Sequence, residues 1–172
     1  MTTGPRVTPR DPIIVWVVDP LSPVTRRDVG AVRDTALAVH GEIPIEVVVT
    51  GDRPGSEAAA RTVVSLLASG QVHPVRVVED VIRAHHDDHD DLSDPEVVQR
   101  LATQRGQDAE AIVLLSAAPA AAAMVTEDRA TARALRDPAD HALFVFGRRG
   151  AVRLPGPGAS AREIIAAIRE AL

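Results

Sequence analysis

The sequence predicts a three-layer α/β domain in which a mostly parallel five-stranded sheet carries helices on both faces. Three observations predict it. Runs of β-branched and aliphatic residues alternate along the chain with longer segments of helical periodicity, as in successive β-α-β units. The first run, Ile13 to Val18, is apolar throughout, which is typical of a strand buried on both faces. The length of 172 residues and the apolar content of 45% fit one domain of ordinary size.

The N-terminal half supplies three predicted strands and two predicted helices. The strands are residues 13–18, 44–50 and 75–78, and the helices run from 25 to 40 and from 56 to 70. Thr25 is the expected N-cap of the first helix, because a short hydroxyl side chain suits that position, and Gly70 is the expected end of the second. The polar segment from His85 to Asp94 is predicted to be a loop.

The C-terminal half supplies the remaining elements. Helices are predicted over 95–104, 108–118, 129–135 and 160–172, and strands over 122–126 and 142–146. Pro95 suits a first helical turn, and Ser160 is the expected cap of the last helix. The predicted organisation is a flexible lead-in over residues 1–11, one α/β domain over 12–154, and a linker with a C-terminal helix over 155–172 that packs on the same domain.

The composition restricts the chemistry that this chain can perform. The sequence contains no Cys, Lys, Tyr or Asn, and all 19 basic residues are Arg. A thiolate nucleophile, a Schiff base and a phosphate-loop lysine are therefore excluded, which leaves carboxylates, histidines, hydroxyls and arginines. The net charge of −5 argues against a broadly basic nucleic-acid coat. Because the apolar run near the start is far shorter than the roughly 20 residues of a membrane span, we expect a soluble, cytoplasmic protein.

Acidic residues follow four of the five predicted strands. They are Asp19, Asp52, the pair Glu79-Asp80 and the pair Glu127-Asp128, while Asp108 and Glu110 stand at a helix start. In an open parallel sheet the carboxyl ends of the strands form the ligand-binding edge. Converging carboxylates favour a hard divalent cation such as Mg²⁺ or Mn²⁺. The alternative is that these acids are ordinary helix caps and turn residues.

The run from Arg105 to Arg136 resembles the C-terminal half of PIN-domain nucleases. That family has an acid at a helix start and then a strand that ends in an acidic pair, and here Asp108 and Glu110 precede Thr126-Glu127-Asp128-Arg129. The family also opens with an apolar strand that ends in Asp, which Asp19 matches, with Ser22 as a nearby hydroxyl. The resemblance covers the first strand and about 35 residues near the C-terminus, with a generic α/β pattern between them.

The resemblance implies a metal-dependent ribonuclease in which a metal-activated water attacks an RNA phosphodiester. It assigns catalysis to Asp19, Asp108, Glu110 and Asp128, with Asp19, Asp108, Asp128 and Glu57 as ligands of Mg²⁺ or Mn²⁺. Arg129, Arg133 and Ser22 are the residues expected to contact the substrate. The implied partners are RNA and an antitoxin or another protein partner, and a homodimer is also an expectation.

Several positions depart from the family pattern and keep other interpretations open. Pro20 follows Asp19, no Asn is present to follow it, and Glu57 lies at the start of its helix rather than inside it. One alternative is a non-catalytic interaction or regulatory module with a relic of the PIN-like site. A flavodoxin-like small-molecule domain is another, although Asp19-Pro20 does not suit a phosphate loop.

The segment from His85 to Asp91 is dense in residues of the types that bind metals. On a helix, His85 and His89 would share one face at a spacing that holds a transition metal. A run of this polarity is more typical of a solvated loop, and we predict a loop.

Overall fold

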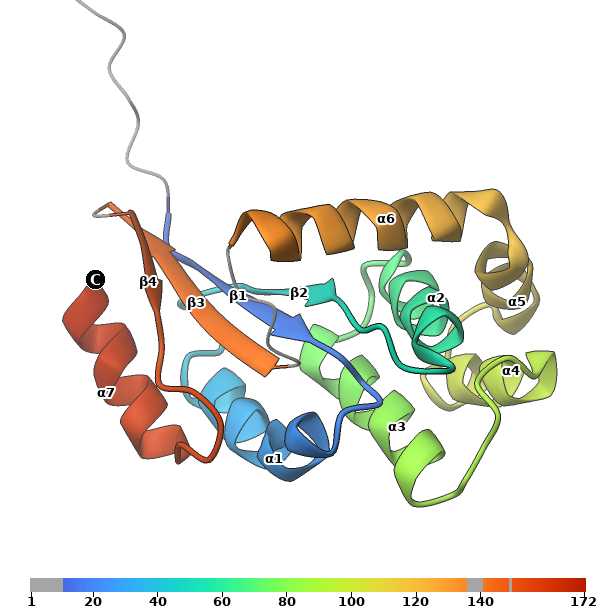
Figure 1. Ribbon diagram of the computed structural model, residues 1–172, viewed down its shortest axis with the longest axis horizontal. Coiled ribbons are helices and arrows are strands. Elements are labelled where there is room, and N and C mark those ends of the chain that lie inside the picture. Colours follow the sequence, from blue (N-terminus) through green and yellow to red (C-terminus); the bar gives the residue numbers. More distant parts are fainter. Residues whose placement is uncertain (1–10, 136–140, 149) are drawn as a thin grey trace, which may run out of the picture.

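The computed structural model, described here for residues 11–135, 141–148 and 150–172, contains one four-stranded mixed sheet (Figure 1). The strand order is β2-β1-β3-β4, with bounds β1 (Ile13–Val18), β2 (Ile45–Val49), β3 (His141–Gly147) and β4 (Gly150–Arg153). Strand β1 pairs with β2 in parallel and with β3 antiparallel, and β3 pairs antiparallel with β4. Strand β2 is therefore an edge strand, while β1 lies in the middle of the sheet.

The described part of the chain contains seven helices. They are α1 (Pro23–Ala38), α2 (Ser56–Leu67), α3 (Pro74–His86), α4 (Pro95–Gln104), α5 (Ala109–Ala117), α6 (Pro119–Ala134) and α7 (Ala161–Ala171). Five of them, α2 to α6, lie between β2 and β3 in the chain, and α2, α4 and α5 gather at one end of the molecule (Figure 1). No single described helix has the length and apolarity to cross a membrane; α5 and α6 meet the criterion only as a pair, with a 68° bend between them.

The two faces of the sheet are covered unequally, and this follows from the alternation of side chains along β1. Trp16 and Val18 point into the main core, where α1 and α7 contribute Val32 and Ile168. On the other face, a smaller cluster packs under the C-terminal part of α6 and contains Val15, Val17, Val48, Ala132, Ala142 and Phe144. The apolar run of β1 is thus buried on both sides, as its sequence predicts.

The predicted five-stranded, mostly parallel PIN-like sheet is wrong. Residues 75–78, expected as a strand, lie in α3, where Pro74 occupies the first turn and Val75, Val78 and Ile82 are buried at helical spacing. Residues 122–126, also expected as a strand, are the middle of α6, in which the Thr126 hydroxyl donates to the carbonyl of Ala122. The short strand β4 was not predicted, since its exposed residues carry no apolar pattern.

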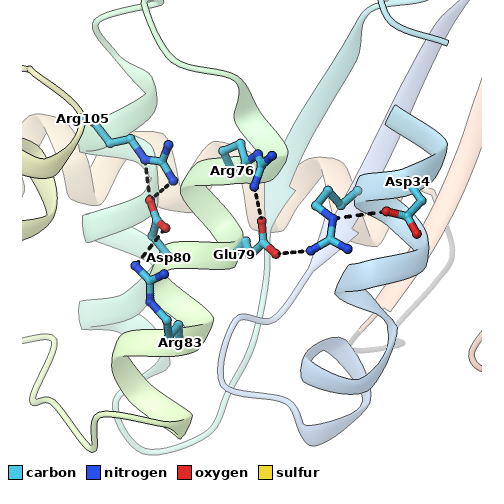
Figure 2. A network of polar contacts seen from close by, with 7 residues as sticks. Asp34, Arg76, Glu79, Asp80, Arg83 and Arg105 are labelled. Atoms are coloured by element: carbon cyan, nitrogen blue, oxygen red, sulfur yellow. Dashed lines mark hydrogen bonds and ion pairs between the residues drawn. The ribbon is translucent and has the colours of Figure 1, made fainter. Parts of the chain in front are cut away.

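The pair Glu79-Asp80, predicted to end a strand, lies on α3 in a network of ion pairs (Figure 2). The carboxylate of Glu79 joins α3 to α1 through Arg33, at 2.8 Å, and also accepts from Arg76 at 3.3 Å. The buried carboxylate of Asp80 accepts from Arg83 at 3.2 Å and from Arg105 in the turn after α4. These two acids therefore link helices and do not line a ligand-binding edge.

Candidate functional site

The candidate site is the N-terminus of α1, directly after the central strand β1. Ser22 is the N-cap of this helix, and its hydroxyl accepts from the backbone N–H of Val24 at 3.2 Å. Pro23 occupies the first helical position, where its missing N–H costs nothing. Thr25, which was predicted as the N-cap, is the third helical residue instead, so the two hydroxyls stand three residues apart on the first turn. Both residues are fully buried.

Asp19, the residue after β1, holds this turn through hydrogen bonds. Its carboxylate is fully buried and accepts from the backbone N–H of Leu21 at 3.0 Å and from the Ser56 hydroxyl at 3.4 Å. The guanidinium of Arg53 donates to it at 3.1 Å and neutralises the buried charge. Asp19 therefore ties the start of α1 to the connection between β2 and α2.

Gly51 allows that connection to approach Asp19 closely. Its φ of 123° is a conformation that residues with a side chain rarely adopt. A Cβ atom at this position would lie 2.6 Å from Cγ of Asp19 and 2.8 Å from the Ser56 hydroxyl oxygen. Only glycine fits without a shift of buried atoms.

His86, at the end of α3, contacts the same turn. Its ring hydrogen-bonds the backbone carbonyl of Pro20, while its buried Nε2 has no hydrogen-bond partner among the described residues. Burial and the neighbouring His85 lower the pKa of His86, so the ring is neutral near pH 7. On the surface beside it, Arg26 pairs with Asp87 at 2.5 Å. The site therefore combines two hydroxyls and a neutral imidazole with two arginines, Arg26 and Arg53.

The structure places three of the predicted metal ligands around the β2–α2 connection, and two of them, Asp19 and Glu57, are paired with arginines. Asp128 accepts from the backbone N–H of Val49 at 2.8 Å, and Asp19 is paired with Arg53 as described. Glu57 is held by Arg61 at 3.0 Å and by Arg129 at 2.7 Å, and Arg129 also donates to the carbonyl of Gly51. Ion pairs satisfy Asp19 and Glu57 without a metal, while Asp128 is held by the backbone N–H of Val49.

The remaining predicted site residues lie elsewhere. Asp108 is the N-cap of α5 and accepts from the backbone N–H of Ala111, while Glu110 is exposed in the first turn of that helix. Arg133 is exposed in the last turn of α6. Among the described residues, no group of three His, Cys, Asp or Glu side chains is placed to hold a metal ion. The expected Mg²⁺ or Mn²⁺ therefore has no such ligand group among the described residues, and RNA, an antitoxin partner and a homodimer stay predictions.

The histidine-rich segment is only partly the loop that the sequence predicts. His85 and His86 belong to the last turn of α3, with ring centroids 4.8 Å apart, and the chain leaves the helix at Asp87. His89 lies beyond the helix with a φ of 57°, so it does not share a helical face with His85. Asp90 pairs with Arg100 on α4, which ties the segment to the helical region.

Replacing Asp128 by Asn is expected to stabilise the protein at neutral pH. Burial raises the pKa of Asp128 from its ordinary value of 3.8 to about 6. At a pH between these two values the carboxyl group is ionised in the unfolded chain but still protonated in the folded chain. Stability therefore falls as the pH rises through that window. Asn keeps an acceptor for the N–H of Val49 and removes the buried charge, and we expect a gain of about 1 kcal/mol after allowance for partial exposure.

Urea denaturation at pH 7.5 and at pH 4 measures this effect. The gain should be present at pH 7.5 and shrink at pH 4, where the folded wild type already holds the proton. Asp108→Asn is the matched control, because Asn caps a helix as well as Asp does and Asp108 is exposed. Equal stability of Asp128→Asn and wild type at pH 7.5 would contradict the argument.

Comparison with known proteins gives a clear result for the fold. No protein-family model matches the sequence, and no curated protein matches it significantly. Solved structures do match. A candidate protein disulfide isomerase from Nitrosomonas europaea has a TM-score of 0.83 at 11% identity, over 94% of this chain and 97% of that one. The fold is that of the DsbA-like thioredoxin proteins.

Two further structures support this assignment. The cytosolic disulfide reductase DsbM from Pseudomonas aeruginosa, described with GSH, has a TM-score of 0.67 at 15% identity, over 83% of this chain and 89% of that one. Reduced DsbA1 from Neisseria meningitidis has a TM-score of 0.70 at 10% identity, over 99% of this chain and 91% of that one. These likenesses, together with the mixed sheet, overturn the PIN-domain resemblance and with it the ribonuclease and the toxin.

The sequence analysis assigns Ser22 to substrate contact and Thr25 to a helix cap, and it does not connect the two as a pair with C-x-x-C spacing. Disulfide oxidoreductases of the thioredoxin and DsbA kinds use a C-x-x-C pair, and a helix N-terminus lowers the pKa of such a cysteine. Ser22-Pro23-Val24-Thr25 has the same spacing at the N-terminus of the helix in the β1-α1-β2 unit. The sequence contains this spacing as S-x-x-T directly after a buried strand. Hydroxyl residues are common at helix starts, so the pattern by itself does not indicate a site.

Proposed function

We propose that this chain is a thiol-dependent thioredoxin-fold protein that binds a low-molecular-weight thiol of the glutathione class at the N-terminus of α1. The observation that carries the proposal is the hydroxyl pair Ser22 and Thr25, which has C-x-x-C spacing on a helix of the DsbA-like fold. The chain has no cysteine, so none of its own residues can perform thiol–disulfide exchange. A bound thiol supplies the missing sulfur.

The chemistry of the site suits a thiolate. A hydroxyl donates to sulfur as the thiol loses its proton, and the positive end of the α1 dipole favours the negative charge. The thiolate then attacks a disulfide sulfur, forms a mixed disulfide and releases the other half as a thiolate. Arg26 and Arg53, exposed beside the turn, suit the carboxylates of a thiol such as glutathione. The likeness to a reductase that is described with GSH supports the same ligand class.

The burial of both hydroxyls adds a condition. Ser22 and Thr25 have no exposed surface in this structure, so a ligand reaches them only through a local opening. We therefore expect binding to change the backbone around the start of α1. Amide chemical shifts of residues 19–27 should report that change.

Titration of the protein with reduced glutathione tests the proposal. We expect saturable binding by calorimetry, with chemical-shift changes at the start of α1. S-methylglutathione, in which the sulfur cannot ionise, should bind at least about tenfold more weakly if the thiolate contact supplies about 1.4 kcal/mol. Binding of both compounds with equal affinity would show that the sulfur is not recognised.

A pair of helix-cap variants separates ligand binding from helix stability. Ser22→Ala and Ser160→Ala each remove a serine N-cap, with an expected loss of about 1 kcal/mol in the free energy of unfolding. Only Ser22→Ala should weaken glutathione binding. If both variants bind glutathione like wild type, the hydroxyl site at α1 is not used.

A further inference from the structure

A second feature of the molecule, at the opposite end of α1 from the candidate site, is a pair of neighbouring histidines, His40 and His73. His40 comes directly after Val39, the C-cap of α1, and His73 is the N-cap of α3. Helices α1 and α3 pack side by side (Figure 1). This packing brings the two histidines together although they are far apart in the sequence. Their ring centroids are 5.9 Å apart, and the ring planes meet at 47°, so the rings are not stacked.

Both rings have nitrogens available for a ligand. Neither ring forms a hydrogen bond or an ion pair with another residue in the described part of the chain, and neither residue caps its helix through the side chain. The rings line a hollow of about 330 Å³ whose other walls are apolar, formed by residues such as Ala36, Ile43 and Pro74. Burial and the neighbouring ring of His40 lower the pKa of His73.

We propose that His40 and His73 together bind one transition-metal ion of the zinc class at this hollow. Imidazole nitrogen is a preferred ligand of Zn²⁺, Ni²⁺ and Cu²⁺ and a poor one for Mg²⁺ and Ca²⁺. Each ring reaches the ion through one nitrogen, with a bond of about 2.0–2.1 Å. Two such bonds, together with the distance from each ring centre to its nitrogen, cover the 5.9 Å between centroids when both rings turn a nitrogen toward the same point. The pair is thus spaced to chelate one ion.

The rest of the coordination shell would be water. No group of three His, Asp or Glu side chains is placed to hold a metal within the described ranges, so the site has two protein ligands and is open. The nearby cation Arg76 is paired with Glu79 at 3.3 Å, which reduces its repulsion of an ion. An ion held in this way would clip the C-terminus of α1 to the N-terminus of α3.

Calorimetric titration with ZnCl₂ tests the proposal on the full chain. We expect one Zn²⁺ per chain, and a higher melting temperature in its presence because the ion binds only the folded arrangement. His40→Gln and His73→Gln should each lower the affinity at least about tenfold, since loss of even an outer-shell partner of a metal site costs that much. Both variants should also lose the thermal shift.

The second histidine pair provides the matched control. His85 and His86 have ring centroids 4.8 Å apart, but the ring of His86 is hydrogen-bonded to the carbonyl of Pro20 and its Nε2 is buried. His85→Gln should therefore bind Zn²⁺ like wild type. Loss of binding in His85→Gln with retention in His40→Gln would place the ion at the wrong pair and overturn the proposal, as would the absence of any binding by wild type. Circular dichroism of each variant checks that the fold is intact.

Discussion

Replacing Gly51 by alanine is expected to lower the free energy of unfolding by about 2–4 kcal/mol. The backbone at Gly51 has a φ of 123°, so any side chain there adds strain. The added Cβ would also lie 2.6 Å from Cγ of Asp19, which is fully buried and cannot move aside. Because Asp19 holds the backbone of Leu21 at the start of α1, the disturbance should reach the candidate site.

Gly41→Ala is the control that separates the two costs. Gly41 also has a positive φ, of 82°, but nothing lies within 4 Å of the Cβ that it would carry. The Gly41→Ala variant should lose only about 1–2 kcal/mol of stability, which is the cost of placing a side chain at a positive φ. Urea denaturation of both variants gives the difference, which measures the contact with Asp19. Equal losses of stability in the two variants would show that the β2–α2 connection can shift away from Asp19 at little cost, which would contradict the close packing at Gly51.

The elements that the sequence predicts well are those whose ends carry their own signals. Strand β1 has the predicted bounds 13–18, because an uninterrupted β-branched run suits the centre of a sheet. Helix α4 has the predicted bounds 95–104, since Asp94 caps it and Pro95 opens it. The Ser160 cap of α7 is confirmed as well, with a complete capping box to Glu163.

The elements that failed are short apolar runs whose periodicity is ambiguous. The valines at 75–78 fit a buried strand or one side of a buried helix equally well. In the structure they form part of α3, which packs against α1 and α2. The alanine-rich segment before Thr126 has the same ambiguity, which its length resolves in favour of α6. Without these two strands, Glu79 and Asp80 lie on a helix among ion pairs, while Asp128 reaches the edge strand β2 from α6 by accepting from the N–H of Val49.

The candidate site was beyond sequence reasoning for a related reason. With cysteine and lysine excluded, the sequence favours carboxylate chemistry, yet Asp19 is neutralised by Arg53, and Glu57 by Arg129 in addition to Arg61 of its own helix. Arg53 and Arg129 reach these acids from other elements, and such contacts depend on the tertiary structure. The absence of cysteine, which counted as an exclusion, becomes informative only when the fold is known to be DsbA-like.

The double variant Ser22→Cys, Thr25→Cys is expected to gain a disulfide-reductase activity that uses its own thiols, which the wild type, having no cysteine, cannot provide. The two positions have C-x-x-C spacing at a helix N-terminus, where the dipole lowers the pKa of a thiol. Serine and cysteine are similar in size, so the buried turn should accept the change at residue 22 with little strain. Oxidation should lower the mass by two hydrogens, and the reduced form should catalyse the reduction of insulin by dithiothreitol.

A second cysteine pair tests whether the fold or only the helix end creates this activity. Ser160→Cys, Glu163→Cys places the same pair at the N-cap and third position of α7, where both residues are exposed. Any helix N-terminus activates a thiol, so this pair should also form a disulfide. If the start of α1 positions a disulfide substrate, the α1 pair should be at least about tenfold faster, despite its burial. Equal or greater activity of the exposed α7 pair would show that the α1 site contributes no positioning, and the DsbA-like fold would then carry no trace of the reaction of its structural neighbours.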